Sequence, residues 1–151
     1  MTTSELYIRK ATEKDIDTVY SIEQNCLNLW KRDYFLQELE NTFSLFLVAI
    51  IKNKIIGYIV AWDVVDEIQI QNITISVPFR KNGYGTYLLK EAIEIFSPLN
   101  KQSLFLEVHE KNTTAQNFYS THGFKIIGER KDYYTSNNNT GNAILMQKVL
   151  S

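Results

Sequence analysis

The amino-acid sequence predicts an α/β fold in which helices flank a mixed central β-sheet. Runs rich in Ile, Val, Phe and Tyr alternate along the chain with segments whose apolar residues recur at helical spacing. Between residues 68 and 108 a strand, a helix and a second strand follow one another, which predicts one parallel crossover. Pairs of strand-like runs joined by polar turns lie on either side and predict antiparallel hairpins. The expected order is β-α-α-β-β-β-α-β-α-β-β.

Length and composition predict a single domain over residues 1–151. With 44% hydrophobic residues, the chain has enough apolar material for one core. The 16 basic and 17 acidic residues give a formal net charge of -1, which argues against nucleic acid or an anionic membrane as a partner. A polar N-terminus and the absence of a run of about 18 apolar residues predict a cytoplasmic protein. Cys26 is the single cysteine, which excludes an intramolecular disulfide and a cysteine-rich metal site.

The N-terminal part predicts a strand followed by two helices. Leu6–Arg9 alternates apolar and polar residues, as a short strand does. Thr12 and Asp15 have the spacing of a capping box, which predicts a helix over Glu13–Leu27. A shorter helix is expected from about Tyr34 to Glu40, with weak starting signals. Five positions of the first helix share one face, and four of the five are apolar: Ile16, Val19, Tyr20, Glu23 and Cys26.

Three strands are expected next. Phe43–Ile51 and Ile55–Val65 are rich in β-branched and aromatic residues and are separated by three polar residues, which predicts a hairpin. The following strand, Ile68–Ile75, changes the phase of its apolar alternation across Gln71 and Asn72. An extra residue in a strand shifts the faces in this way, so the pattern predicts a β-bulge. The alternative is that these two polar residues mark the end of the strand.

The chain then predicts a helix that packs on a sheet and a buried strand. The helix has an apolar stripe and ends at Ser97 and Pro98; the stripe is Leu88, Leu89, Ala92, Ile93 and Phe96. Leu104–Val108 is a nearly continuous apolar run, typical of a strand that is covered on both faces. Glu107 interrupts that run.

The C-terminal part predicts a short helix and a hairpin. Asn112 is a suitable N-cap for the helix, and Gly123 stands where a left-handed C-cap is expected. Phe124–Tyr134 and Ala143–Leu150 are expected to be strands, joined by a polar loop at residues 136–142.

The loop that contains Gly83 and Gly85 is the first candidate functional feature. It lies between a predicted strand and a predicted helix, where unpaired amide groups and the helix dipole favour a bound phosphate. A plain strand-to-helix turn is the alternative. A Walker-type phosphate loop is rejected, because Gly85 is followed by Thr86 and no lysine stands at the required place.

Two further nucleotide-binding interpretations remain for this loop. A dinucleotide fold would need a glycine where Leu88 stands, although Glu107 follows the loop at a suitable spacing in the sequence for a ribose contact. The other interpretation is a loop whose consecutive amide groups hold a pyrophosphate without a lysine in the motif, assisted by Arg80 and Lys81.

The segment Arg80-Lys81-Asn82-Gly83-Tyr84-Gly85 resembles the acyl-CoA pyrophosphate loop of the GNAT acetyltransferases, in which Arg or Gln precedes Gly-x-Gly/Ala by two residues. The resemblance covers nearly the whole chain and implies the GNAT fold. Within this family the chain is most similar to the RimI type, which acetylates the N-terminal amine of a ribosomal protein. The segments that carry this second resemblance are Asp66-Glu67, Asn72-Ile73, Leu106-Glu107-Val108, Asn112, Phe118-Tyr119, Gly123-Phe124, Tyr133-Tyr134 and Ala143-Ile144-Leu145-Met146.

The resemblance implies roles for individual residues. Glu107 would be the general base, and a strand-end carboxylate that pairs with a cation is the alternative. Tyr119 would be the general acid toward the CoA sulfur, and core packing of its ring is the alternative. Asn112 would contact CoA and is equally expected as a helix N-cap. The full implied set for acetyl-CoA is Ile73, Thr74, Ile75, Arg80, Lys81, Asn82, Gly83, Tyr84, Gly85, Thr86 and Asn112.

Several positions differ from the RimI pattern. Leu29-Trp30-Lys31 replaces the usual Pro-Trp-Ser, and Asn142 replaces the usual acidic residue ahead of the last strand. Trp30 and Tyr134 remain as candidate walls of the acceptor groove. His109 and His122 are expected to face solvent or to complement a helix dipole, so neither belongs to the predicted site.

The resemblance therefore implies direct acetyl transfer from acetyl-CoA to a protein N-terminal amine, such as that of a ribosomal protein, without a metal. Cys26 lies far in sequence from the implied catalytic residues, so no covalent enzyme intermediate is expected. A small amine such as a polyamine or an amino sugar is the alternative acceptor. A non-catalytic acyl-CoA-binding module is the alternative of another class.

Overall fold

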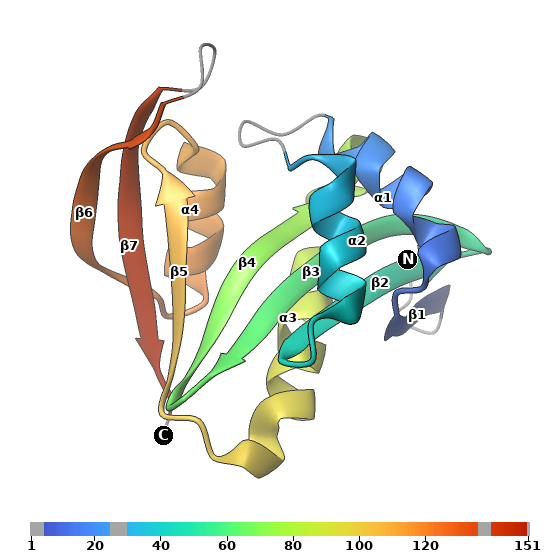
Figure 1. Cartoon of the computed structure of the whole chain (residues 1–151), viewed down its shortest axis with the longest axis horizontal. Helices are drawn as coiled ribbons and strands as arrows, with labels where there is room; N and C mark the ends of the chain where they lie inside the picture. Colours follow the sequence, from blue (N-terminus) through green and yellow to red (C-terminus); the bar gives the residue numbers. More distant parts are fainter. Residues whose placement is uncertain (1–4, 25–29, 136–139, 151) are drawn as a thin grey trace.

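The computed structural model describes residues 5–24, 30–135 and 140–150, and in this part of the chain a seven-stranded mixed sheet lies between two helical layers (Figure 1). The strand order is β1-β2-β3-β4-β5-β7-β6, and the order of elements along the chain confirms the prediction. The main elements are β1 Leu6–Lys10, α1 Ile16–Glu23, α2 Arg32–Glu40, β2 Ser44–Ile51, β3 Lys54–Val64, β4 Glu67–Ile75, α3 Tyr84–Phe96, β5 Ser103–His109, α4 Thr113–Thr121, β6 Lys125–Tyr134 and β7 Gly141–Val149.

Each face of the sheet has its own apolar core, because successive strand side chains point to opposite faces. Along β3, Tyr58 and Val60 belong to the cluster under α1 and α2, whereas Ile59 and Ala61 belong to the cluster under α3 and α4. The first cluster contains Ile16, Val19, Ile22, Phe35, Phe46, Val48, Tyr58 and Val60. The second is larger and continues across β4, β5 and β7. The two layers thus bury both faces of the central strands.

The start of α1 has the predicted capping box. Residues Glu13–Asp15 form a 3-10 turn before the α-helix, and the Thr12 N–H donates to the Asp15 carboxylate at 2.7 Å. Arg9 also donates to that carboxylate, at 2.7 and 2.9 Å. The α-helix ends at Glu23 with Gln24 as its C-cap, so the predicted end at Leu27 is too late. Cys26 lies outside the described residues.

The first hairpin has the expected form. Lys52 and Asn53 have φ angles of 50° and 64°, which is the backbone of a two-residue turn that matches the twist of its strands. The α2 helix begins at Arg32, two residues before the predicted start, and Lys31 caps it without a side-chain hydrogen bond. The missing cap explains why the signal for this boundary is weak in the sequence.

The predicted bulge lies in β4 and marks the point where the sheet opens. Asn72 pairs with Val60 while Ile70 pairs with the next residue of β3, so Gln71 is the extra residue. The strand continues to Ile75, which excludes the alternative that it ends at the bulge. The parallel pairing of β4 with β5 covers only Glu67–Ile70, whereas β5 pairs with β7 along its whole length. The carboxyl-terminal parts of β4 and β5 therefore diverge, as Figure 1 shows.

The remaining elements agree with the prediction except in one loop. Helix α3 is followed by a 3-10 turn at Ser97–Leu99, and Gly123 has a φ of 90° just after α4. The predicted loop at residues 136–142 is too long, because β7 already begins at Gly141, which pairs with Tyr134 of β6. Asn142 stabilises the hairpin, since its side-chain oxygen accepts the Asp132 N–H at 2.8 Å. Residues 136–139 lie outside the described ranges.

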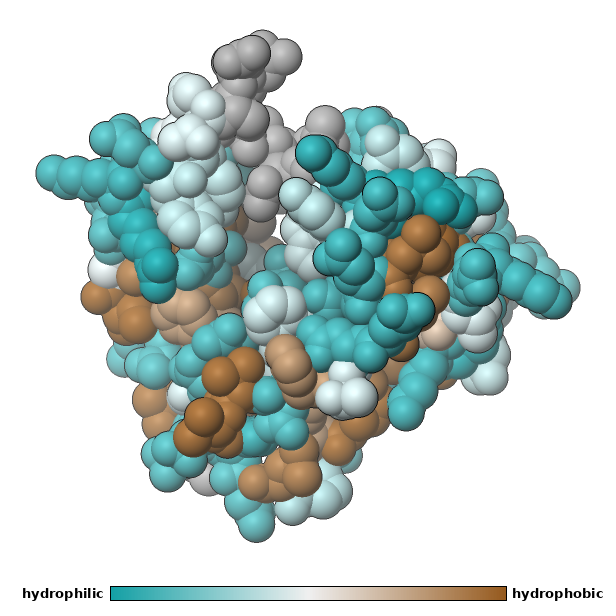
Figure 2. Space-filling model, viewed as in Figure 1, coloured by the Kyte–Doolittle hydropathy of each residue, from teal (hydrophilic) through white to brown (hydrophobic). Residues whose placement is uncertain are grey.

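The surface mixes polar and apolar residues. Figure 2 shows hydrophobic patches separated by hydrophilic side chains on the face that carries α1 and α2. Within the described ranges, no helix is long and apolar enough to cross a membrane.

Candidate active site

A cavity of about 710 Å³ opens where β4 and β5 diverge. Its wall comes from β4, the glycine loop, the start of α3, the end of β5 and one side of α4, with Trp30 and Tyr134 at its border. Of the residues that the sequence predicts for catalysis, acetyl-CoA or the acceptor, all except Asn82 line this cavity. The Asn82 amide instead donates to the carbonyls of Phe79 and Arg80 at 3.3 and 3.2 Å, so it holds the loop from outside.

The glycine loop presents amide groups at the start of α3. Tyr87 donates its N–H to the Gly83 carbonyl at 3.2 Å, so the amides of residues 84–86 precede the first intrahelical bond. Gly83 has a φ of 83° and Lys81 a φ of 66°, a combination that turns successive N–H groups toward one concave surface. A Cβ at Gly83 would meet nothing within 4 Å, so the space in front of the loop is open.

Two residues fix the position of this loop. A Cβ at Gly85 would lie 3.2 Å from the Phe118 ring, so a glycine here lets α3 approach α4 closely. Arg80 donates its Nε–H to the Ile75 carbonyl at 2.8 Å and thereby bends over the end of β4. Its remaining N–H groups are on an exposed side chain at the cavity wall, where they can bind a phosphate. The Tyr84 ring is buried in the core, so of its polar groups the backbone amide is the one available to a ligand.

His122 connects α4 to the start of α3. Its Nδ1 lies 2.7 Å from the Phe118 carbonyl, which can only accept a hydrogen bond, so Nδ1 carries the proton. In the neutral ring Nε2 then accepts from the Thr86 hydroxyl at 2.8 Å. The expectation that His122 complements the helix end is confirmed, and its contact with Thr86 was not foreseen.

Glu107 lies at the border of the cavity with a positive and a phenolic neighbour. Its side chain is 20% exposed, and the half-exposed Arg130 places Nη2 3.4 Å from Oε1. The pKa of Tyr133 is raised, first by burial and then by the charge of Glu107 and a hydrogen bond with it. The interpretation of Glu107 as an ion-pair partner is therefore observed, but the pair is partly solvated and the carboxylate still lines the cavity.

Tyr119 both packs and faces the cavity. Its ring contacts Phe118 and Phe124 edge-on, each with a centroid distance of 5.4 Å, and only 6% of the residue is exposed. Burial raises the pKa of its hydroxyl, because the phenolate would be poorly solvated. Tyr119 is thus a protonated hydroxyl at neutral pH, which is the form that a general acid needs.

His109 was wrongly expected to face solvent. It is 2% exposed and lines the cavity, with its ring stacked on Tyr134 at 4.6 Å and 19°. Nδ1 accepts the Lys111 N–H at 3.0 Å, and Nε2 has no hydrogen-bond partner in the described structure. Burial and the charge of Glu107 raise the pKa of Tyr134 to about 12. The signal for His109 was its position two residues after Glu107, which puts both on one face of β5.

The opposite border of the cavity contains Trp30 and Asn72, of which Asn72 was not predicted. The Trp30 ring lies 5.1 Å from that of Phe35, at the edge of the α1 and α2 core. Asn72 comes from the bulge of β4, and its side-chain oxygen accepts the Thr74 hydroxyl at 3.1 Å. A polar residue at the phase change of a strand is the signal that could have identified it.

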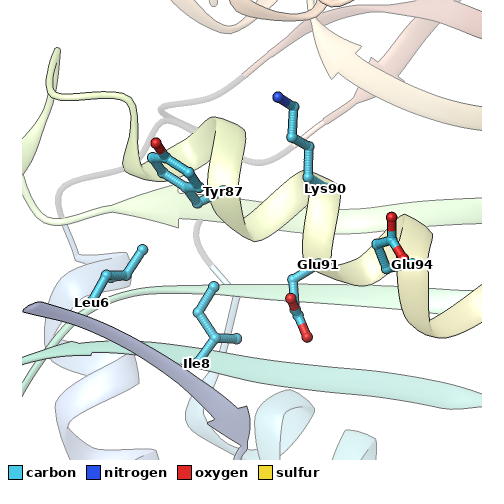
Figure 3. Close-up of a pocket in the computed structure, with 6 residues that line it drawn as sticks. All are labelled: Leu6, Ile8, Tyr87, Lys90, Glu91 and Glu94. Atoms are coloured by element: carbon cyan, nitrogen blue, oxygen red, sulfur yellow. The ribbon is translucent and has the colours of Figure 1, made fainter. Parts of the chain in front are cut away.

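A second hollow, of about 270 Å³, lies between β1 and α3 (Figure 3). Two aliphatic side chains of β1 point toward the helix, and the other lining residues come from α3: Leu6, Ile8, Tyr87, Lys90, Glu91 and Glu94. No predicted site residue lines it. In the described ranges, no group of three or more His, Cys, Asp or Glu residues is arranged to hold a metal ion.

Known proteins share both the sequence pattern and the fold of this chain. The model of the acetyltransferase (GNAT) family matches residues 16–124. A Bacillus subtilis (strain 168) protein, described as a candidate ribosomal protein bS18-alanine N-acetyltransferase, is 36% identical over 132 residues, 86% of this chain and 87% of that protein. The ribosomal protein bS18-alanine N-acetyltransferase of Haemophilus influenzae is 34% identical over 121 residues, 80% of this chain and 82% of that protein.

A solved structure extends the likeness to three dimensions. The crystal structure of Ard1 from Thermoplasma volcanium superimposes with a TM-score of 0.88 at 27% identity, covering 97% of this chain and 99% of that one. The match includes the strands that diverge around the cavity, because it spans almost the whole chain.

Proposed function

Because this chain belongs to the GNAT family of acetyltransferases and is an acetyl-CoA-dependent N-acetyltransferase, we propose that its acceptor is the N-terminal α-amine of a protein. Two relatives at 36% and 34% identity are described as acting on the alanine of ribosomal protein bS18, one of them as a candidate. A ribosomal protein with a small N-terminal residue is therefore the first acceptor to test. The proposal treats residues 1–151 as one catalytic domain that works in the cytoplasm.

The observation that carries this proposal is the shape of the cavity and the placement of Glu107 and Tyr119 in it. Glu107 lies on the side of the sheet that carries Trp30, and Tyr119 lies on the side of the glycine loop. An acceptor can thus approach between the aromatic rings of Trp30 and Tyr134, while acetyl-CoA lies along α3 and α4. A chain end fits such a passage, because a free N-terminus can reach the thioester without unfolding.

Acetyl-CoA would be held by backbone and charge. The amides of residues 84–86, with Arg80 and Lys81, would bind the pyrophosphate. The edge of Ile73–Ile75 that faces away from β3 would align the pantetheine arm and polarise the acetyl carbonyl, since β5 does not pair there. Asn112 caps α4 through Oδ1, which accepts the Ala115 N–H at 3.1 Å, and its Nδ2 donors remain for CoA.

The reaction would need two proton transfers around one acyl transfer. The acceptor nitrogen attacks the thioester carbon and loses a proton to the Glu107 carboxylate, directly or through water. The C–S bond then breaks, and the departing thiolate takes a proton from the Tyr119 hydroxyl. The resulting phenolate is poorly solvated, so it recovers a proton readily, which resets the site.

The test is mass spectrometry of acceptors incubated with the protein and acetyl-CoA. The panel contains peptides with free N-termini and blocked lysines, peptides with blocked N-termini and free lysines, and small amines such as a polyamine and an amino sugar. The proposal expects acetylation of the free N-termini, with the highest rate for small first residues. Acetylation of the small amines alone would overturn it, and transfer to none of them would favour a non-catalytic module.

A further inference from the structure

Glu23 is a buried carboxylate that the proposed mechanism does not use. It ends α1 and is the one polar member of the otherwise apolar face that the sequence pattern identified. Its exposed fraction is 0%, which is unusual for an acidic side chain. Glu23 is not itself part of the cavity wall. A carboxylate at such a place needs hydrogen-bond donors, because an unpaired buried charge is costly.

At least three donors from separate segments meet at this carboxylate. The Trp30 backbone N–H donates to Oε2 at 2.9 Å. The Asn72 amide lies 3.1 Å from both oxygens. The hydroxyl of Tyr58, which is itself 0% exposed, donates to Oε1. Since an ionised carboxylate only accepts hydrogen bonds, each of these donors suits it.

Two of these donors belong to residues of the cavity wall that come from different segments of the chain. Trp30 lies at the acceptor border, and Asn72 follows the bulged residue Gln71 of β4, just before the segment that would align the thioester. Asn72 also accepts the Thr74 hydroxyl at 3.1 Å, so the network continues into that segment. Glu23 therefore lies behind the wall and joins the acceptor border to the strand of the acyl donor.

We propose that Glu23 is a positioning residue that sets the distance between the acceptor amine and the thioester. It acts through Trp30 and Asn72, not by contact with either substrate. The proposal rests on the proposed acetyl transfer, but it concerns whichever amine the wild-type protein accepts. The role of Glu23 can therefore be disproved while a protein N-terminus remains the acceptor. Equally, the acceptor can prove to be another amine while the role of Glu23 stands.

This geometry requires a carboxylate at position 23, and not only a side chain of the size of Glu23. A glutamine has nearly the same shape, but its NH₂ group would face at least one of the three donors. That donor would lose its partner inside the protein, and the segment that carries it would move to find another. Glu23→Gln should thus alter the passage for the acceptor while the glycine loop, which lies elsewhere on the wall, stays in place.

The experiment compares Glu23→Gln with Val19→Ala at a temperature far below both melting temperatures. Val19 lies one turn earlier on α1 in the same core and makes no polar contact through its side chain, so its truncation reports loss of stability alone. Glu23→Gln is expected to lower kcat/KM for the acceptor by about tenfold while the Kd for CoA stays within about twofold. Val19→Ala should leave both constants within about twofold of wild type.

A second pair of variants keeps the proposal testable if Glu23→Gln folds poorly. Asn72→Asp alone places two carboxylates together and should impair transfer strongly. The double variant Glu23→Gln/Asn72→Asp restores an amide–carboxylate pair in the opposite sense and should recover at least about tenfold of that loss. The proposal is overturned if Glu23→Gln keeps wild-type kcat/KM, if CoA binding falls as much as acceptor turnover, or if the double variant is no better than Asn72→Asp.

Discussion

Glu107 and Tyr119 reach one cavity from opposite faces of the same sheet. Leu106 and Val108 belong to the core that also contains Tyr119, so Glu107, which lies between them on β5, points to the other face. Both residues nevertheless line the cavity, because β4 and β5 separate at this level. The proposed base and the proposed acid therefore reach the cavity from opposite faces of the sheet, and a thioester would lie between them.

Replacing Glu107 by Gln should slow acetyl transfer without weakening CoA binding. Loss of a general base typically costs about 100-fold or more in rate. Glu107 lies on β5 and is not part of the glycine loop that would bind CoA. Thiol release under saturating substrates and calorimetry with CoA would measure the two effects. Glu110→Gln is the control, because Glu110 follows the same strand but does not line the cavity. An unchanged kcat in Glu107→Gln would exclude the base role.

Replacing Tyr119 by Phe should lower kcat by about 10-fold to 100-fold and leave the melting temperature nearly unchanged. The ring and its contacts with Phe118 and Phe124 are retained, and only the proton donor is removed. Burial raises the pKa of Tyr119 above its ordinary value of 10.0, so its hydroxyl stays protonated as pH increases through 9. The wild-type pH–rate profile should therefore show no loss from this group below about pH 10. A falling limb at pH 8 that Tyr119→Phe abolishes would contradict this.

Gly83→Ala should weaken acetyl-CoA binding. The φ of 83° is unfavourable for a residue with a Cβ by about 1–2 kcal/mol, whatever space surrounds it. If the loop relaxes, its amides turn away from the pyrophosphate and the Kd for CoA rises by up to about tenfold. Gly128→Ala is the matched control, because its Cβ would lie at an ordinary 3.4 Å from Leu145. Equal CoA affinities in the two variants would argue against an anion site at this loop.

Asp15→Asn should destabilise the protein at neutral pH but not in acid. The pKa of Asp15 is lowered, mainly by hydrogen bonds from Arg9 and also by the Thr12 amide. As pH falls, Asp15 is therefore protonated in the unfolded chain before it is protonated in the folded protein. The stability that its charge contributes is present above about pH 4 and is lost as pH falls through the pKa of Asp15 in the folded state. Urea unfolding should show a loss of about 1 kcal/mol at pH 7 that shrinks toward pH 2. Asp17→Asn, whose side chain is 83% exposed, should have little effect, and an equal loss from Asp15→Asn at both pH values would contradict the linkage.

The fold was predictable because its signals are local. The phase change at Gln71, the capping box at Thr12 and the polar turn at Lys52 each follow from the spacing of neighbouring residues, and the structure has all three. The GNAT fold expected from the resemblance is confirmed by the family match over residues 16–124 and by the solved relative with a TM-score of 0.88. Convergence of the predicted residues on one cavity then follows from the fold.

The unpredicted contacts depend on register between segments far apart in sequence. Arg130 reaches Glu107 across β7, and the pairing of Ala143 with both His109 and Arg130 brings these strands into line. The burial of His109 was missed because a strand end usually faces solvent, whereas here Tyr134 covers it. Glu23 looked like an exception to an apolar stripe, and its donors become visible only when α1 is placed against β4.

The short ladder between β4 and β5 has a mechanical consequence. Residue pairs from Glu67–Ile70 and Ser103–Leu106 are the hydrogen-bonded seam that joins the half-sheet β1–β4 to the half-sheet β5–β7. An acyl arm lying along Ile73–Ile75 would extend this seam, so a bound cosubstrate would stiffen the two halves against each other. Departure of CoA would leave the seam short again. Each turnover would thus complete and reopen the sheet, and the rigidity of the whole molecule would follow the state of its substrate.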